Sequence, residues 1–278
     1  MSFSPEWLGL REPADHAARS DSLLAQVRSH FDGRDNISVV DLGCGAGSNL
    51  RRTFAALPDR QNWRLVDYDP KLLAAARKRL AAWADVAAPD GEGLVIEKDG
   101  KAIAVAFHKA DLNLALDTAL PVDADLVTAA ALFDLVSPAW INRFVGILAR
   151  RRLPLYTVLT YDGTERWEPP HPADGAMLAA FHAHQGTDKG FGPAAGPQAT
   201  DLMASAFVAA GYDVRRAPSP WRLGADFAVL ARELVTGFAA AVRETGQVPE
   251  TVIDAWLDAR LASVTCEVGH EDLFAVPR

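Results

Sequence analysis

The sequence predicts an α/β fold in which helices cover both faces of a mostly parallel β-sheet. Three observations lead to this prediction. A short β-branched run at 37–42 leads directly into a turn with glycines at three alternate positions, and then into a helix. Strand-like and helix-like segments alternate from there to residue 160, and several of the strands are followed closely by an acidic residue. Such alternation is typical of a parallel sheet, because each return to the same sheet edge needs a crossover connection.

Length and composition restrict the classes of protein to consider. The chain has 278 residues, enough for one large domain or for one domain with insertions, and we favour the second. A net charge of −8 argues against tight binding to a nucleic-acid backbone. Two cysteines are too few for a disulfide framework, no N-terminal leader is evident, and no apolar run approaches the roughly 20 residues of a membrane-spanning helix. We therefore expect a cytoplasmic protein that binds neither membranes nor nucleic acids.

The segment before the first strand is expected to be helical. Residues 7–31 carry apolar side chains at spacings that share one helix face, and Gly33 marks the end. Within this segment Asp15 and Arg19 lie one helical turn apart. We favour an ion pair between them, worth only about 0.3 kcal/mol, over the alternative in which they reach a bound ligand.

The turn after the first strand is the most informative stretch of the chain. Gly43, Gly45 and Gly47 lack Cβ atoms, so backbone N–H groups there and at the following helix start can approach a polar ligand closely. The spacing is G-x-G-x-G, whereas a dinucleotide fingerprint has G-x-G-x-x-G. Asp41 on the strand would repel a pyrophosphate and attract an ammonium group. The turn therefore favours a ligand with a cationic group.

A carboxylate follows the second strand. The apolar run 63–66 ends in Asp67, which lies 20 residues after Gly47. At this distance a neighbouring strand end brings a carboxylate to the hydroxyls of a ribose. Asp69, directly before Pro70, is the expected N-cap of the next helix.

The third strand is expected to arise from a hairpin. Asp99 and Gly100 form a tight-turn pair between the apolar segments 94–98 and 101–107. The second arm would be the third strand of the sheet, and the first an added edge strand. The second arm leads to Asp111, which places another acidic residue after a strand.

Two further strands are expected at 125–130 and 153–160, separated by a helix that begins at Ser137 and Pro138. Asp134 lies between the first of these strands and the helix. It faces the region in which a substrate should sit, although a solvated loop carboxylate is an equally good interpretation.

The C-terminal part has the pattern of an interrupted strand pair. An amphipathic helix at 201–210 and a strand at 212–217 come first, and a closing strand is expected at 272–276. Residues 218–263 interrupt the pair with two amphipathic helices. These helices would extend the domain, or would form the face of a homodimer.

Taken in order, these stretches resemble the class I S-adenosylmethionine-dependent methyltransferases. D-L-G-C-G-A-G resembles their motif I, D-Y-D-P resembles their D-x-S-P pattern with Asp69 in place of Ser, and D-L-V-T-A-A-A-L-F-D-L-V resembles motif IV and its sequel. The resemblance covers residues 37–160 well and the closing strand pair loosely. It implies a Rossmann-like fold with a seven-stranded, mostly parallel sheet, helices on both faces, an antiparallel last strand, an N-terminal helical cap and helical insertions.

The resemblance also implies S-adenosylmethionine as the cofactor. Asp67 would bind the ribose hydroxyls, while Asp111 and the backbone N–H of Leu112 would bind adenine. Asp41 would hold the α-ammonium group, and Arg19 would reach the methionine carboxylate. The cofactor-binding residues implied in this way are Asp41, Gly43, Gly45, Gly47, Asp67, Tyr68, Asp111, Leu112, Ala130 and Arg19.

Acceptor recognition is expected in the segment 164–200. This segment is rich in His, aromatic, Gly and Pro residues and follows a strand end, where open α/β sheets bind ligands. His182 and His184 are candidate bases, and a metal site built on such histidines is the less favoured interpretation. The expected substrate-binding residues are Tyr161, Asp162, His171, Phe191 and Arg222, although a surface ion pair is the favoured role of Arg222.

The reaction implied by the resemblance is methyl transfer. The end of the fourth strand lacks the (D/N)-P-P-(Y/F) tetrad with which many relatives hold a nucleobase or amide nitrogen, so we expect an O or N atom of a small molecule as acceptor. Asp134 is the first candidate base. A nicotinamide-dependent oxidoreductase and a non-catalytic S-adenosylmethionine-binding protein are the alternatives.

The chain is therefore expected to have four parts. Residues 1–36 form an N-terminal helical cap, and residues 37–217 form the cofactor-binding core, including the lid at 164–200. Residues 218–263 form the two-helix insertion, and residues 264–278 contain the closing strand of the core.

Overall fold

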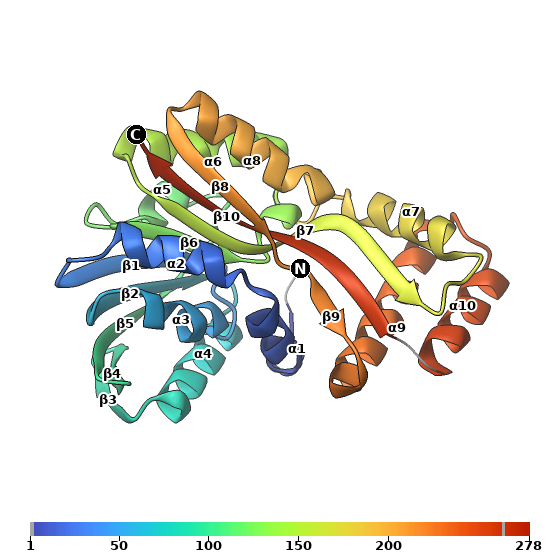
Figure 1. Cartoon of the computed structure of the whole chain (residues 1–278), viewed down its shortest axis with the longest axis horizontal. Helices are drawn as coiled ribbons and strands as arrows, with labels where there is room; N and C mark the ends of the chain where they lie inside the picture. Colours follow the sequence, from blue (N-terminus) through green and yellow to red (C-terminus); the bar gives the residue numbers. More distant parts are fainter. Residues whose placement is uncertain (1–2, 263–264) are drawn as a thin grey trace.

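The computed structural model describes residues 3–262 and 265–278, in which a ten-stranded sheet forms the centre (Figure 1). The strand order is β3-β4-β5-β2-β1-β6-β7-β10-β8, and β9 pairs with β10 outside this path. The strands are β1 (Asn36–Leu42), β2 (Arg60–Asp67), β3 (Val86–Asp90), β4 (Gly93–Lys98), β5 (Lys101–Lys109), β6 (Leu126–Ala130), β7 (Leu155–Glu168), β8 (Tyr212–Pro218), β9 (Trp221–Leu223) and β10 (Thr265–Pro277).

Helices connect most of these strands. The α-helices are α1 (Pro5–Ala18), α2 (Asp21–His30), α3 (Ser48–Thr53), α4 (Pro70–Trp83), α5 (Leu116–Ala119), α6 (Pro138–Arg151), α7 (Asp174–Gln185), α8 (Ala199–Ala209), α9 (Ala228–Thr245) and α10 (Glu250–Ala262). Short 3₁₀ helices are η1 (Phe54–Ala56), η2 (Phe133–Leu135), η3 (Gly196–Gln198) and η4 (Ala225–Phe227).

Seven strands form the expected Rossmann-like sheet. The neighbours β5, β2, β1, β6 and β7 run parallel. Strand β10 lies between β7 and β8 and is antiparallel to both. The prediction of a mostly parallel seven-stranded sheet with an antiparallel last strand is therefore confirmed.

The two faces of the sheet bury two separate apolar clusters. Alternate residues of β1 belong to different clusters: Ile37 and Val39 pack into one, and Val40 and Leu42 into the other. The first cluster also contains residues of α2, α3 and α4, and the second contains residues of α5, α6 and α8. This division follows from the period of two in a strand and explains why β1 has buried apolar side chains on both of its faces.

The N-terminal segment differs from its prediction. It forms two helices, because the backbone at Arg19 is extended (φ −60°, ψ 141°) and Ser20 caps a new helix by accepting a hydrogen bond from the backbone N–H of Leu23. A serine cap in the middle of an apolar pattern is the signal for this break. The interruption places Arg19 outside the helical face on which the ion pair with Asp15 was expected.

The sheet edge carries a strand that the sequence does not predict. The hairpin of β4 and β5 is confirmed, and β3 extends it by pairing antiparallel with β4. All five residues of β3 are exposed, so this strand lacks the apolar alternation on which strand prediction depends.

Strands β7 and β10 continue beyond the sheet as a two-stranded ribbon, around which α7, α9 and α10 gather (Figure 1). The sequence ends the fifth strand at Thr160 and the closing strand begins at Asp272. Both limits are wrong, because the two segments pair with each other as far as Glu168 and Thr265. The first residues of the expected lid therefore belong to a strand.

The helices of the insertion are confirmed as α9 and α10. They pack with α7 and the ribbon around an aromatic cluster of Trp167, Phe181, Phe238 and Trp256. Strand β9, which precedes α9 and pairs with β10, is too short to predict. Within residues 3–262 and 265–278, no helix has both the length and the apolar character needed to cross a membrane.

Candidate functional site

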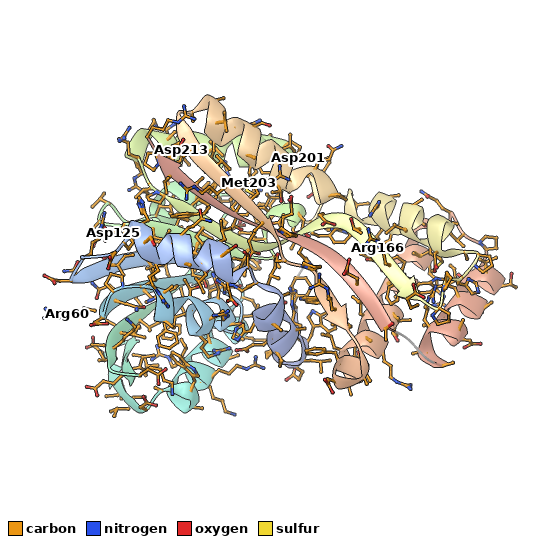
Figure 2. All side chains as sticks on the ribbon, in the orientation of Figure 1. Arg60, Asp125, Arg166, Asp201, Met203 and Asp213 are labelled. Atoms are coloured by element: carbon orange, nitrogen blue, oxygen red, sulfur yellow. The ribbon has the colours of Figure 1, made fainter. Side chains whose placement is uncertain are left out.

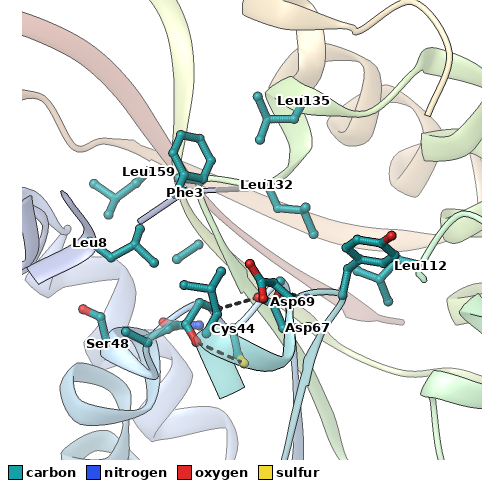
Figure 3. Close-up of a pocket in the computed structure, with 18 of the residues that line it drawn as sticks. Phe3, Leu8, Cys44, Ser48, Asp67, Asp69, Leu112, Leu132, Leu135 and Leu159 are labelled. Carbon is teal, nitrogen blue, oxygen red and sulfur yellow. Dashed lines mark hydrogen bonds between the residues drawn. The ribbon is translucent and has the colours of Figure 1, made fainter. Parts of the chain in front are cut away.

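A cavity of about 440 Å³ opens at the carboxyl ends of β1, β2, β5 and β6 (Figure 3). Residues of α1, η2, β7 and the loop at 189–191 form its other walls. Asp41 and Gly47 do not line it. Eight of the ten residues predicted for the cofactor do, namely Arg19, Gly43, Gly45, Asp67, Tyr68, Asp111, Leu112 and Ala130.

The glycine turn forms the floor of the cavity. Gly43, Gly45 and Gly47 have φ values of 62°, 52° and 77°, a region that other residues rarely adopt. A Cβ atom at Gly45 would lie 3.0 Å from Cδ1 of Leu8, and one at Gly43 would lie 3.3 Å from Cδ1 of Leu132. The backbone conformation therefore favours glycine at all three positions, and Leu132 and Leu8 leave little room for a Cβ atom at Gly43 and Gly45.

Asp67 lies beside this turn at the end of β2. Its Oδ2 accepts a hydrogen bond from the backbone N–H of Gly45 at 2.9 Å, and its Oδ1 accepts one from that of Asp69 at 3.0 Å. Burial raises the pKa of Asp67, and these N–H groups oppose the rise. Tyr68 follows it with 65 % of its surface exposed, and Asp69 caps α4 as predicted.

Asp41 does not line the cavity. The residue is fully buried on β1, and its Oδ1 accepts a hydrogen bond from Nδ2 of Asn49 at 2.7 Å. Burial raises the pKa of Asp41 to about 7. Asn49 lines the cavity and separates Asp41 from it, so direct contact between Asp41 and a ligand ammonium is not supported.

Arg19 lines the cavity with only 4 % of its surface exposed. Its two terminal nitrogens donate to Oδ1 of Asn49 at 3.0 Å and to Oγ1 of Thr53 at 2.8 Å. Within the described residues no carboxylate forms an ion pair with it, and its Nε has no hydrogen-bond partner. A buried guanidinium beside neutral partners attracts an anion.

The favoured ion pair between Asp15 and Arg19 is wrong. Asp15 accepts hydrogen bonds from Nε and Nη2 of Arg11, at 2.9 and 3.1 Å, and from Nε1 of Trp221 at 3.0 Å. Arg11 precedes Asp15 by one helical turn, so the R-x-x-x-D spacing was the available signal. Sequence reasoning also missed His16, whose Nε2 lies 2.9 Å from Oγ of Ser48 at the glycine turn.

The opposite end of the cavity lies near Asp111 and Leu112. Oδ1 of Asp111 accepts a hydrogen bond from the backbone N–H of Asn113 at 2.8 Å, and the carbonyl of Leu112 accepts one from Nε1 of Trp140 at 3.1 Å. The ring of Phe191 packs edge-on against that of Trp140, with centroids 5.7 Å apart. The lid segment thus reaches this end of the cavity, where Phe191 is one of its walls.

Asp134 lies on η2 and does not line the cavity itself. Its neighbours Leu132 and Leu135 do, and Figure 3 shows both above Asp67. Its Oδ2 accepts a hydrogen bond from Nε2 of Gln185 at 3.3 Å, while its Oδ1 has no partner among the described residues. Burial raises the pKa of Asp134 to about 6.

Tyr161 and His182 meet behind the cavity wall. The hydroxyl of Tyr161 lies 3.1 Å from Nε2 of His182 and 3.4 Å from Oε1 of Glu165. Burial lowers the pKa of His182 and raises that of Glu165 to about 8. Neither Tyr161 nor His182 lines the cavity, so their predicted roles would require a movement of the lid.

Four other predicted residues lie outside the cavity. His184 faces a separate hollow, where its Nε2 lies 2.9 Å from Oε2 of Glu244. His171 accepts a hydrogen bond from the N–H of Ala173 before α7, and Asp162 accepts one from the N–H of Thr164. Arg222 is exposed and forms an ion pair with Glu267, which agrees with the surface ion pair favoured from the sequence. These placements do not support base or substrate-binding roles for His184, His171, Asp162 and Arg222.

Comparison with known proteins supports the fold assignment. No family model and no curated protein matches the sequence. A cyclopropane-fatty-acyl-phospholipid synthase-like protein from Lactobacillus casei is similar in structure, with a TM-score of 0.55 and 13 % identity over 95 % of this chain and 91 % of that one. The cyclopropane synthase MmaA2 from Mycobacterium tuberculosis has a TM-score of 0.51 and 13 % identity, over 98 % and 94 %.

A third similar structure is the YcgJ protein of Bacillus subtilis, with a TM-score of 0.50 and 12 % identity over 93 % of this chain and 99 % of that one. Likeness at such low identity establishes the fold. The protein has the Rossmann-like fold of the class I S-adenosylmethionine-dependent methyltransferases.

Proposed function

We propose that this protein is an S-adenosylmethionine-dependent methyltransferase that acts on an O or N atom of a small molecule. One observation carries the proposal. A single cavity brings together the glycine turn, the carboxylates of Asp67 and Asp111, and the buried guanidinium of Arg19. The glycine turn, Asp67 and Asp111 lie at the carboxyl ends of the neighbouring strands β1, β2 and β5, and Arg19 lies in the N-terminal segment that covers them. Each of these groups can bind a different part of the cofactor.

The donor set fits the cofactor group by group. Arg19, which forms no ion pair within the described residues and whose Nε has no hydrogen-bond partner there, would bind the methionine carboxylate. The α-ammonium group would lie near Asn49, whose Nδ2 donates to the buried carboxyl group of Asp41 behind it. Asp67 would accept hydrogen bonds from the ribose hydroxyls, and Asp111 would bind the adenine amino group. The sulfonium of the bound cofactor supplies a methyl group that is already electrophilic.

The geometry of the turn favours this cofactor over a dinucleotide. A pyrophosphate would need free backbone N–H groups at the glycine turn. The N–H of Gly45 is already bonded to the carboxylate of Asp67, and that negative charge would repel a phosphate. The oxidoreductase alternative is therefore disfavoured.

The remaining walls suit a small acceptor. Phe3, Leu135 and Leu159 line the cavity, and Figure 3 shows all three above Cys44 of the glycine turn. An apolar wall excludes water and leaves the acceptor to be aligned by shape. The volume lies within the range of small-molecule sites, about 300 to 1,000 Å³.

A hydroxyl or ammonium acceptor must lose a proton, and Asp134 is the proposed base. Its unpartnered Oδ1 lies on η2 between two cavity-lining leucines, and its raised pKa of about 6 suits proton acceptance near neutral pH. Because Asp134 does not line the cavity, bound acceptor must reach it by a shift of a leucine side chain or through one water molecule.

The test begins with calorimetric titration of the protein with S-adenosylmethionine, S-adenosylhomocysteine and NADH. Micromolar binding of the first two, lost in Asp67→Ala and kept in Asp123→Ala, supports the cofactor assignment. Asp123 is exposed and lies outside the cavity, so it is a matched control. Binding of NADH alone would reverse the assignment.

Transfer is tested next, by incubating the protein with methyl-labelled S-adenosylmethionine and fractions of a small-molecule extract. Label in a small molecule, absent with Asp67→Ala, supports the enzyme. Cofactor binding without transfer to any fraction would favour a non-catalytic binding protein.

A further inference from the structure

The buried carboxyl group of Asp272 joins two segments that line the cavity. Its Oδ1 accepts a hydrogen bond from the backbone N–H of Leu159, and its Oδ2 accepts one from that of Ser20, both at 2.9 Å. Asp272 is fully buried on β10 and does not line the cavity. One side chain thus connects β7 with the link between α1 and α2.

Leu159 needs this partner because of its backbone. Its φ is 58°, a left-handed conformation that costs a residue with a Cβ about 1 kcal/mol or more. The register between β7 and β10 shifts at this point, where Glu271 faces Thr160 but Leu273 faces Thr157. The buried N–H of Leu159 therefore depends on Asp272 for its hydrogen bond. The left-handed conformation that this bond supports sets the position of Leu159 in the cavity wall.

Ser20 connects Asp272 with the cofactor site in a different way. It directly follows Arg19, and both residues have extended backbones between α1 and α2. Fixing the N–H of Ser20 fixes the start of α2, and with it the point from which the guanidinium of Arg19 reaches Asn49. Burial raises the pKa of Asp272, and the Ser219 side chain, the N–H groups of Leu159 and Ser20, and the positive charge of Arg19 oppose the rise, in that order.

We propose that Asp272 is a positioning residue for cofactor binding. It holds Arg19 where the guanidinium can bind the cofactor carboxylate, and it holds Leu159 in the conformation that forms the facing wall. The proposal rests on the proposed function, because it gives Arg19 the methionine carboxylate as its ligand. It adds a residue that lies outside the cavity and that no cofactor motif contains.

The test compares two ligands by calorimetry: S-adenosylhomocysteine, and 5′-methylthioadenosine, which lacks the amino-acid part. Asp272→Asn keeps the size of the side chain but replaces one acceptor oxygen with an N–H₂ group, so one of the two backbone hydrogen bonds is lost. We expect at least about tenfold weaker binding of S-adenosylhomocysteine. Binding of 5′-methylthioadenosine should change less than about threefold. Equal weakening of both ligands would overturn the proposal.

Asp125→Asn is the matched control. Asp125 also accepts a hydrogen bond from a backbone N–H, that of Ser38 at 2.9 Å, and it forms an ion pair with Arg34. It lies before β6, at the amino ends of the parallel strands, on the same side in Figure 2 as Arg60 at the start of β2, whereas the cavity lies at their carboxyl ends. This variant should bind both ligands within about twofold of the wild type. If Asp125→Asn also lost S-adenosylhomocysteine binding selectively, the positioning role proposed for Asp272 would be overturned.

A second pair of variants changes the donor of this hydrogen bond and leaves Asp272 in place. Ser20→Pro has a φ compatible with the −69° of Ser20, and it replaces the N–H that donates to Asp272 with a ring Cδ, which displaces the carboxyl group. Ser20→Ala is the control variant. Both substitutions remove the hydroxyl that caps α2, but only Ser20→Ala keeps the N–H that donates to Asp272. Weaker S-adenosylhomocysteine binding in Ser20→Pro than in Ser20→Ala, with circular dichroism unchanged, is expected. Equal affinities would contradict the proposal.

A double-mutant cycle tests whether Asp272 acts through Arg19. In an Arg19→Gln background the guanidinium is absent, so Asp272→Asn should cause little further loss of S-adenosylhomocysteine affinity. Additive losses would overturn the proposal. If the wild type binds no S-adenosylhomocysteine, the proposed function fails as well; if it binds and the variants show no selectivity, only the role of Asp272 fails.

Discussion

The carboxylate of Asp67 accepts a hydrogen bond from the backbone N–H of Gly45, with 2.9 Å between the two heavy atoms. The two residues follow neighbouring parallel strands, β2 and β1, so this bond ties the glycine turn to the adjacent strand end. The second carboxylate oxygen is held by the N–H of Asp69. The acidic group is therefore fixed in position before any ligand binds.

This relationship predicts a graded response at position 67. Asp67→Asn keeps the shape but replaces one acceptor with a donor, so it loses one backbone hydrogen bond and the charge that favours the ribose hydroxyls. We expect about tenfold weaker S-adenosylhomocysteine binding by calorimetry, with a larger loss in Asp67→Ala. Equal effects of the two substitutions would argue that only the charge matters, and unchanged affinity would remove Asp67 from the site.

Asp134→Asn should lower turnover and leave cofactor binding nearly unchanged. Loss of a general base typically costs about 10² to 10⁴ in rate. In the wild type the base acts only when ionised, so kcat/KM should rise with pH as Asp134 loses its proton near pH 6, and level off above that. The measurement is a pH profile with an acceptor found by the labelled-methyl screen. A variant with wild-type turnover would exclude Asp134 from the mechanism.

Glu165 should make stability fall as pH rises. Burial raises its pKa to about 8 in the folded protein, against about 4.3 in the unfolded chain. The folded state therefore holds a proton that the unfolded state has released, and the free energy of unfolding falls with rising pH by up to about 1.4 kcal/mol per pH unit. Urea unfolding from about pH 7.5 to about 8.5, where unfolded histidines are mostly neutral, measures this slope. Glu165→Gln should flatten it, and an unchanged slope would contradict the assignment.

Trp256→Ala should strongly destabilise the ribbon and its helices. Trp256 is fully buried, stacks against Phe238 with ring centroids 5.3 Å apart, and donates a hydrogen bond from Nε1 to Asp174 at 2.7 Å. Removal of such a side chain costs about 3 to 5 kcal/mol. Val229→Ala on α9, where Val229 is 63 % exposed, should change stability by less than about 0.5 kcal/mol. Similar losses in both would show that Trp256 does not anchor this part.

The cofactor side of the site could be predicted because its residues follow the strands directly. Gly43, Asp67 and Asp111 each come at or just after a strand end, and parallel strands bring their carboxyl ends to one edge. The acceptor side could not be predicted in the same way. Arg11 and Leu159 reach the cavity from α1 and β7, and nothing in the local pattern of either segment indicates that they meet.

The sequence by itself determined the α/β class, the strand order of the motifs and the cofactor edge of the sheet. These features depend on local periodicity, on glycine and on caps such as Ser137, which act over a few residues. The tertiary structure alone decided which polar groups of distant segments pair. Trp221 of β9 donates to Asp15, and Arg19 donates to Asn49 and Thr53, because hydrogen bonds between distant segments depend on how the chain packs and not on spacing.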